Sequence, residues 1–134
     1  MNVLVDTSVW SLALRRSVAR RSAETAELVE LVGEGRVAIM GPIRQEILSG
    51  IRAAEQYKKL RDRLRAFSDL RLDETDYEEA AACFNRCRAK GLQGSNTDFL
   101  MCAVSLRRKL TILTTDKDFA GFALVLGFDL HQPR

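Results

Sequence analysis

The sequence predicts an α/β fold, a three-layer α/β/α arrangement with a central, mostly parallel sheet. Short apolar runs of the kind found in buried strands alternate with longer segments in which apolar residues recur at helical spacing. This alternation favours parallel strands with helices on both faces of the sheet. The chain has 134 residues, of which 46% are hydrophobic and 29% charged, so we expect residues 1–134 to form a single globular domain.

One strand and two helices are expected near the N-terminus. Residues 2–5 form a short apolar strand. A helix begins near Ser8, because apolar residues follow it at helical spacing. Ser22 offers the N-cap of a second helix, which ends at Gly33.

The middle of the chain predicts a second buried strand at residues 37–40. Pro42 then stands where a proline suits the first turn of a helix, and this short helix ends at Gly50. Residues 53–67 form a polar, amphipathic helix rich in arginine and lysine, and residues 70–72 are expected as an edge strand.

The last third of the chain predicts two longer helices, opened by capping boxes at residues 75–78 and 95–98, that reach about Lys90 and Leu106. After them come, in order, a strand at 110–115, a short helix from about Asp118 and a last strand at 127–131.

The composition argues against several classes of protein. No apolar run approaches the roughly 20 residues needed to span a bilayer, and the N-terminus lacks the basic start of a signal peptide, so the cytosol is the expected compartment, away from any membrane. The three cysteines include no CxxC pair, which predicts reduced thiols. His131 is the only histidine, which argues against a zinc site and against Ser–His or Cys–His catalysis. If the protein is an enzyme, its chemistry should rest on carboxylates.

Basic residues are grouped along the chain, which carries a net charge of +3. The groups are Arg15-Arg16, Arg20-Arg21, Arg61, Arg63, Arg65 and Arg107-Arg108-Lys109. Such clusters are compatible with binding to nucleic acid, although a charged run on a helix is usually a solvated face.

Several acids fall where the predicted strands end. Asp6 and Asp116 each follow a strand, so both carboxylates should project from the same edge of the sheet, where open α/β sheets bind their ligands. Glu46 lies in the first turns of the helix after the second strand and can reach that edge. Asp98 opens a helix that leads into a strand. Such a helix normally starts at the opposite edge, and the sequence alone leaves the placement of Asp98 open.

Acids gathered at one edge predict a divalent cation. Two carboxylates about 4 Å apart repel by roughly 1 kcal/mol in water and about 4 kcal/mol at an effective dielectric constant of 20. Protonation or a bound cation relieves this repulsion. Oxygen ligands without histidine or cysteine suit Mg²⁺ or Mn²⁺ better than zinc. These ions stabilise developing charge on a phosphodiester, so the acids and the basic clusters together suggest phosphodiester hydrolysis.

Each acid also has a simpler structural explanation. Asp98 is the third position of a capping box, where the helix N-terminus favours an acid. Asp118 precedes a short helix and is expected as its N-cap. Glu46 can be an ordinary exposed residue, and Ser8 and Thr114 can be helix caps or strand formers. The set of acids supports a functional site more strongly than any single member.

Four segments carry a recognisable pattern: VLVDTSVW at the start, GPIRQEILSGIR in the first third, SNTDFLMCAVSLRR later and ILTTDKDFAGFA near the end. In this order they resemble the PIN-domain family, and more narrowly the VapC-type toxins, which are ribonucleases of type II toxin–antitoxin systems. Each motif alone is short, but the four in order are specific and span nearly the whole chain. The resemblance implies a PIN-like nuclease domain.

The resemblance also implies roles for individual residues. The implied catalytic residues are Asp6, Glu46, Asp98 and Asp116. Asp6, Asp98 and Asp116 match metal-binding positions of the family, and the family fold brings the start of the Asp98 helix to the acidic edge. Thr114 matches the usual hydroxyl companion of the last acid. Asp118 corresponds to an acid found in many members but not all, and is a candidate supporting residue.

The implied activity is Mg²⁺-dependent, or Mn²⁺-dependent, endoribonuclease cleavage of RNA, with the clustered arginines positioning the RNA backbone. The implied role is that of a toxin that inhibits growth until a VapB-type antitoxin lays a C-terminal segment across the active-site groove. Members of the family usually form homodimers, and the helical segments around Trp10 and at residues 53–67 are candidate dimer surfaces.

Two other functions stay open at the level of sequence. An aspartyl-phosphate-forming phosphatase also begins with an acid after the first strand, but it typically needs a second acid two residues later, where this chain has Ser8. The other is a non-catalytic PIN-like module that binds RNA or protein without cutting. The presence of all four acids argues against that second alternative.

Overall fold

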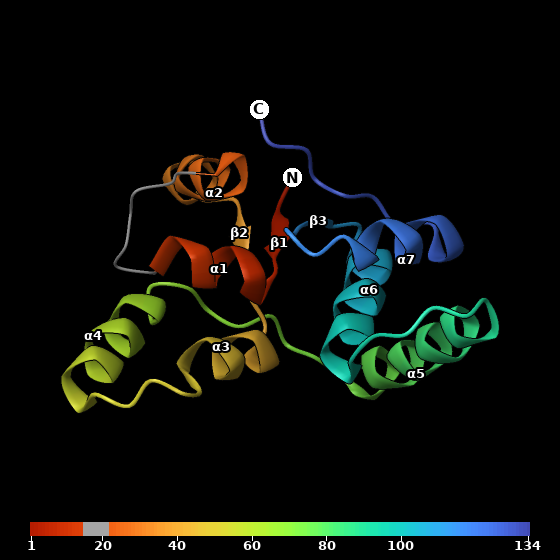
Figure 1. The fold of residues 1–134 in the computed structure, drawn as a ribbon, viewed down its shortest axis with the longest axis horizontal. Coiled ribbons are helices and arrows are strands. Elements are labelled where there is room, and N and C mark those ends of the chain that lie inside the picture. Colours follow the sequence, from red (N-terminus) through yellow and green to blue (C-terminus); the bar gives the residue numbers. More distant parts are fainter. Residues whose placement is uncertain (15–21) are drawn as a thin grey trace.

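The computed structural model describes residues 1–14 and 22–134, so the Arg15-Arg16 and Arg20-Arg21 clusters lie outside the described residues. Within those ranges the chain forms seven helices and three strands in the alternating order that the sequence predicts (Figure 1). The elements are β1 (Val3–Val5), α1 (Thr7–Leu14), α2 (Ala23–Gly33), β2 (Val37–Ala38), α3 (Gly41–Leu48), α4 (Ala54–Leu64), α5 (Glu74–Ala89), α6 (Asn96–Arg108), β3 (Thr111–Leu113) and α7 (Asp118–Leu126).

The three strands form a parallel sheet in the order β2-β1-β3. An isolated parallel bridge at Asp69 extends the sheet beyond β2, and another at Leu130 extends it beyond β3. The strands expected at 70–72 and 127–131 are therefore present as single bridges only, and the first lies slightly earlier than predicted. The sheet grows from β1 in both directions. In open α/β sheets the ligand crevice lies at such a point, outside the carboxyl ends of the strands, which here are the ends of β1 and β3.

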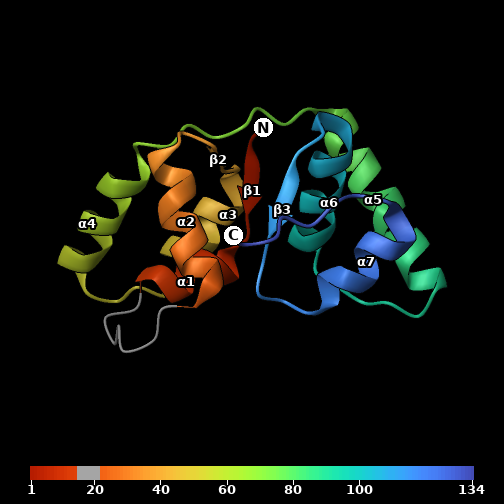
Figure 2. The same ribbon diagram turned by 90° about the horizontal axis from the view of Figure 1, so that it is seen from above.

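Helices cover the sheet in two groups. Figures 1 and 2 both show α1–α4 on one side of the strands and α5–α7 on the other. All three residues of β1 are fully buried, as expected for a central parallel strand covered on both faces. The predicted three-layer α/β/α fold is confirmed, and the two helix groups leave the carboxyl ends of β1 and β3 between them.

The pair of α5 and α6 determines where α6 starts. Asp76 in the first turn of α5 accepts hydrogen bonds from Arg107 (2.6 Å) and Arg108 (2.7 Å) at the end of α6. The capping box of α5 is formed by Asp73 and Asp76, two residues before the predicted box at 75–78. Aspartate is a strong N-cap residue, and the two arginines hold its partner in place, so the helix begins at the earlier site.

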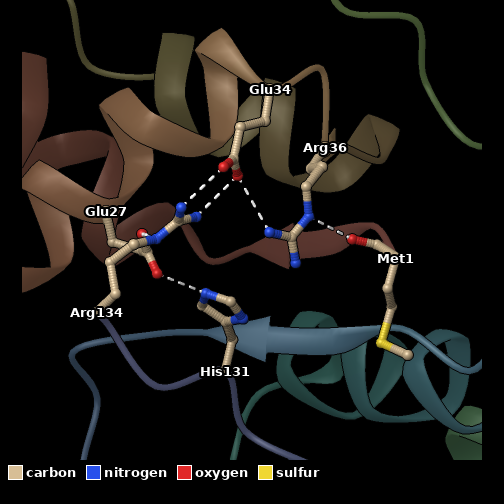
Figure 3. Close-up of polar contacts among 6 residues, drawn as sticks. All are labelled: Met1, Glu27, Glu34, Arg36, His131 and Arg134. Carbon is tan, nitrogen blue, oxygen red and sulfur yellow. Dashed lines mark hydrogen bonds and ion pairs between the residues drawn. The ribbon is translucent and has the colours of Figure 1, made fainter.

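The C-terminal segment is tied to α2 by ion pairs (Figure 3). Glu27 is buried. Its carboxylate is hydrogen-bonded to His131 Nε2 at 2.8 Å and accepts a hydrogen bond from Arg134 Nε at 2.8 Å. The guanidinium of Arg134 also forms two hydrogen bonds of 2.8 Å with Glu34. The only histidine of the chain therefore contacts a structural carboxylate, on the segment that adds the Leu130 bridge to the sheet.

The cysteines agree with the prediction of reduced thiols. Cys83, Cys87 and Cys102 are all free and buried. Burial raises the pKa of Cys83 to about 11, so this thiol stays protonated at neutral pH. No helix in the described part of the chain has the length and apolar character needed to cross a membrane.

Candidate active site

Asp6 lies where β1 ends, beside the end of β3. Its backbone N–H donates to the carbonyl oxygen of Leu113 at 2.9 Å, which holds the two strand ends together. The residue is only 7% exposed. Its Oδ2 accepts hydrogen bonds from Ser8 Oγ (2.9 Å) and Thr114 Oγ1 (2.8 Å). Because both hydroxyls approach the same oxygen, the Asp6 carboxylate is held in one orientation.

Asp116 is connected to Asp6 through a single hydroxyl group. The backbone N–H of Asp116 donates to Thr114 Oγ1 at 2.9 Å, and the same hydroxyl donates to Asp6. Ser8 Oγ in turn accepts from the backbone N–H of Thr115 at 3.2 Å. The turn after β3 is thereby fixed against the end of β1, and the two acids lie at the same edge of the sheet, as the strand pattern predicts.

The prediction that Asp118 caps the last helix is wrong. The N-cap residue of α7 is Lys117, whose side chain makes no capping hydrogen bond, and Asp118 is the first residue of the helix. Lys117 already has helical backbone angles (φ −64°, ψ −22°), so the N–H of Asp118 is one of the unpaired donors of the first turn. Asp116 Oδ1 accepts that N–H at 2.9 Å. The capping role belongs to Asp116, and Asp118 is an exposed acid beside it.

Asp98 reaches the same edge because α5 and α6 run in opposite directions. The start of α5 contacts the end of α6 through Asp76 and Arg107, and the end of α6 leads into the beginning of β3. The beginning of α6 therefore lies at the far end, where the strands finish. A helix that precedes α6, rather than a strand, carries the chain back, which the sequence could not establish without the family resemblance.

Asp98 is also part of a helix cap, as its position in the predicted capping box indicates. Asp98 Oδ2 accepts the backbone N–H of Ser95 at 2.9 Å, and Ser95 Oγ accepts the N–H of Asp98 at 3.1 Å. Gly94 is required beside this box. A Cβ at that position would lie 2.8 Å from the Phe122 ring and 3.2 Å from Asp98 Oδ2. A side chain at position 94 would therefore crowd both the Phe122 ring and the Asp98 carboxylate.

Glu46 on α3 joins the site through Thr7. The Thr7 hydroxyl, next to Asp6 in the chain, donates to Glu46 Oε1 at 2.7 Å. Glu46 is exposed, so it lies at the rim rather than inside the cluster. Thr7 and Ser8 are site residues whose roles sequence reasoning missed. The signal was present in the hydroxyls that directly follow the first acid, at the start of a helix.

The acids share one electrostatic environment. Burial raises the pKa of Asp6, and the charge of Asp116 raises it further, while hydrogen bonds from Thr114 and Ser8 act in the opposite direction. Burial also raises the pKa of Asp98, with additional contributions from Asp6 and Asp116. These three carboxylates are far apart in sequence, but they repel one another at one edge of the sheet.

The donor set fits a hard divalent cation. In the described part of the chain none of these three carboxylates forms a salt bridge with lysine, arginine or histidine. Among the same residues, no three acidic, histidine or cysteine side chains lie in an arrangement that could hold a metal ion as they stand. Mutual repulsion keeps uncompensated carboxylates apart, and a cation of the Mg²⁺ type draws them together.

The basic clusters differ in whether their side chains are paired with acids. Arg107 and Arg108 both pair with Asp76, so these two arginines hold the α5–α6 junction together, whereas Lys109 of the same cluster is exposed. The cations of α4 remain at the surface. Lys59 and Arg63, with other residues of α4 and the loop before it, line a groove of about 590 Å³.

Comparison with known proteins agrees with the fold and the motifs. The chain matches the PIN domain over residues 3–124. A VapC ribonuclease of Mycobacterium bovis is 31% identical over 127 residues, 92% of each chain, and ribonuclease VapC11 of Mycobacterium tuberculosis matches to the same extent. The solved structure of FitAcB from Neisseria gonorrhoeae has a TM-score of 0.75 at 18% identity, covering 98% of this chain and 97% of the other. The chain therefore belongs to the PIN-domain family, in which these curated relatives are VapC ribonucleases.

Proposed function

We propose that the protein is a divalent-metal-dependent endoribonuclease and the toxic component of a toxin–antitoxin pair. One observation carries the proposal: Asp6, Asp98 and Asp116 come from separate segments, the charge of Asp116 contributes to the raised pKa of both other acids, and none of the three forms a salt bridge with a cationic side chain within the described residues. Buried charge of one sign lowers stability. An arrangement that the fold holds in place at this cost is typical of a functional site.

The three aspartates would hold Mg²⁺, or alternatively Mn²⁺. Bound there, the ion supplies a Lewis acid for the scissile phosphate and lowers the pKa of a water molecule. The residues of the chain orient the donors. Ser8 and Thr114 fix Asp6 through Oδ2. Ser95 fixes Asp98, also through Oδ2.

Glu46 has a different role in the proposal. It is exposed at the rim, and its carboxylate accepts a hydrogen bond from Thr7, the residue that follows Asp6 in the chain. A carboxylate in this position can accept a hydrogen bond from the attacking water and take up its proton. Glu46 is therefore the group we assign to the nucleophile rather than to the metal.

RNA binding requires positive charge outside this acidic crevice. The groove that Arg52, Lys59 and Arg63 line supplies it, and we assign the RNA backbone to this face in place of Arg107 and Arg108. The relatives named VapC ribonuclease support an RNA substrate, and the family resemblance supports a VapB-type antitoxin partner and a homodimer.

The test is cleavage of single-stranded RNA by the purified protein in Mg²⁺ or Mn²⁺, with and without EDTA. Asp6→Ala and Asp98→Asn should both abolish cleavage, whereas Glu30→Gln, which removes an exposed acid on α2, should not. Cleavage that survives EDTA, or that the two aspartate variants retain in full, would exclude the metal nuclease. RNA binding without any cleavage by the wild type would instead identify a non-catalytic module.

A phosphatase that forms an aspartyl-phosphate has less support. The position two residues after Asp6 is Ser8, whose hydroxyl donates to Asp6 Oδ2 at 2.9 Å. That residue orients the first acid and cannot act as the second acid of such a phosphatase.

A further inference from the structure

A second groove opens next to the acidic crevice, and none of the residues described so far as catalytic lines it. It has a volume of about 500 Å³ and runs between the first turn of α6, the middle of α5 and the start of α3. Its walls include Tyr77, Phe84 and Asn85 of α5 and Asn96 of α6. The opening is large enough for a planar ring system of the size of a nucleobase.

The lining of the groove includes near neighbours in sequence of two candidate site residues, Asp98 and Glu46. On α6, the lining residues Asn96 and Thr97 come directly before Asp98 in the same helical turn. On α3, the lining residue Pro42 precedes Glu46 by four positions, which places both on one face of the helix. The groove therefore lies between the two helices that carry Asp98 and Glu46.

The chemistry of the lining differs from that of the groove beside α4. None of the ten residues that line this second groove is charged, whereas Arg52, Lys59 and Arg63 line the groove of α4. A neutral lining offers little to a phosphate group. Aromatic rings and side-chain amides, by contrast, are the groups that stack on bases and pair with the hydrogen-bonding edges of bases.

The aromatic wall is preorganised. Phe84 packs edge-on against Phe99 with ring centroids 5.4 Å apart, and Phe99 contacts Phe122 at 4.9 Å. On Phe84, the guanidinium of Arg88 lies 5.7 Å from the ring centroid. A ring held by several neighbours loses little freedom when a ligand binds, which favours affinity. Tyr77 is 55% exposed and provides a free aromatic face at the rim.

We propose that this groove, formed by Tyr77, Phe84, Asn85 and Asn96 beside Asp98, binds one nucleobase of the single-stranded RNA next to the scissile phosphate. The inference rests on the proposed nuclease function and extends it to substrate selection. The base stacks on Tyr77 and Phe84, and the amides of Asn85 and Asn96 contact the base edge. The α4 groove takes the backbone, so one face supplies affinity through charge and the other supplies sequence preference.

The first experiment measures binding of a short labelled RNA to the Asp6→Asn protein, which should not cut it. Adding Tyr77→Ala should weaken binding by about 5- to 150-fold, the range for losing one stacked base. The slope of affinity against salt should stay the same, because no phosphate contact is removed. The control is Val29→Ala, which removes a 66% exposed apolar side chain on α2, away from both grooves, and should leave affinity unchanged.

The second experiment maps the cut sites of otherwise wild-type protein in a pool of randomised RNA. Asn85→Ala should relax the preference at one position next to the cut while cleavage continues. Unchanged affinity in Tyr77→Ala together with unchanged cut-site preference in Asn85→Ala overturns the proposal. If Tyr77→Ala instead dissociates a dimer in sedimentation and leaves RNA affinity intact, the groove is an interface between copies, and the proposal also fails. If wild type cuts nothing, the nuclease function fails, and the binding measurement still tests the groove separately.

Discussion

Asp6 and Asp76 are both buried carboxylates, but the chain surrounds them in opposite ways. Asp6 accepts hydrogen bonds from two hydroxyl groups, and burial raises its pKa, with a further contribution from the charge of Asp116. Burial also acts to raise the pKa of Asp76, but the backbone N–H of Asp73 and the guanidinium groups of Arg107 and Arg108 outweigh it, so the pKa is lowered overall. The fold therefore disfavours the anionic form of Asp6 and favours the anionic form of Asp76, each relative to an ordinary aspartate.

The difference separates function from stability within one molecule. At the α5–α6 junction, charge is neutralised by arginine and holds two helices together. At the ends of β1 and β3, charge is left uncompensated by the described side chains, which lowers stability unless a cation binds. Glu27, like Asp76, is a carboxylate whose charge is neutralised by basic side chains. Burial acts to raise its pKa, and hydrogen bonds from His131 and Arg134 overcome this and lower it.

The largest expected effect is the loss of activity in Asp6→Asn without loss of stability. Removing one donor of the cation site should lower the rate of RNA cleavage by about a thousandfold or more, since metal ions contribute several kcal/mol to the transition state. The amide keeps an oxygen that can accept from Ser8 and Thr114, and repulsion by Asp116 and Asp98 is removed. The Tm should therefore be equal to that of wild type or higher.

The two readings are cleavage kinetics in Mg²⁺ and thermal unfolding followed by circular dichroism without metal. If Asp6→Asn instead loses activity because it unfolds, its Tm will be lower than that of wild type. Asp6 would then be a structural acid like Asp76, and its assignment to the active site would be wrong.

Asp76→Asn should show the reverse pattern. We expect a loss of about 2 to 4 kcal/mol in the free energy of unfolding, because two arginines lose their anionic partner. The cost stays below the full value for a buried pair because the side chains of Arg107 and Arg108 are 33% and 27% exposed and can reach water. Cleavage per folded molecule should not change. Urea unfolding measures the loss, and Asp62→Asn, which removes an acid with a 51% exposed side chain, should change stability by less than about 0.5 kcal/mol.

Acid should affect the two kinds of carboxylate with opposite signs. For Asp76 and Glu27, whose folded-state pKa values lie below the ordinary 3.8 and 4.5, the stabilisation is present above those values and is lost as pH falls towards the lowered ones. For Asp6 and Asp98, with raised pKa values, protonation favours the folded state as pH falls from neutrality. Stability should therefore pass through a maximum on the acid side of neutrality and then fall below about pH 4.5.

Urea unfolding at a series of pH values from 7 to 2 gives this curve. In Asp6→Asn, the free energy of unfolding should rise less than in wild type as pH falls from neutrality. In Asp76→Asn, it should fall less than in wild type below about pH 4.5. If both variants follow the wild-type curve at a constant offset, then the pKa of Asp6 is not raised and the pKa of Asp76 is not lowered.

The placement of Asp6 and Asp116 follows from sequence because each acid comes soon after a short apolar strand, and parallel strands end at one edge. Asp6 directly follows β1, whereas β3 ends at Leu113, earlier than the predicted 115, and a short turn separates it from Asp116. Asp98 does not follow in the same way. Its position depends on the antiparallel pairing of α5 and α6, and the ion pairs that fix this pairing join residues 31 and 32 positions apart. Long-range side-chain contacts of this kind have no periodic signature in the sequence.

The end of the last predicted strand shows a second limit. Asp116 and Asp118 both offer a side chain that can cap a helix, and the choice depends on the backbone angles of Lys117 between them. A difference of one residue in the start of α7 exchanges the roles of the two acids. Helix existence was predictable here, but the cap was not, because boundaries depend on local angles that propensity does not determine.

The smallest effect is stabilisation by the cation itself. Mg²⁺ that binds the folded protein only should raise the free energy of unfolding by about 1.4 kcal/mol at ten times its Kd, which for a domain of this size raises the Tm by about 3 to 6 °C. Asp76→Asn should show the same increment from its lower starting point, since the helix junction is independent of the site. Asp6→Asn should show little or none, because one ligand and part of the repulsion are gone. Thermal unfolding across a Mg²⁺ series, with Ca²⁺ and raised NaCl as comparisons, measures the increment for all three proteins. An equal increment in Asp6→Asn would mean that Mg²⁺ binds elsewhere, whereas its selective loss would show that the uncompensated carboxylates are the ones that a cation completes.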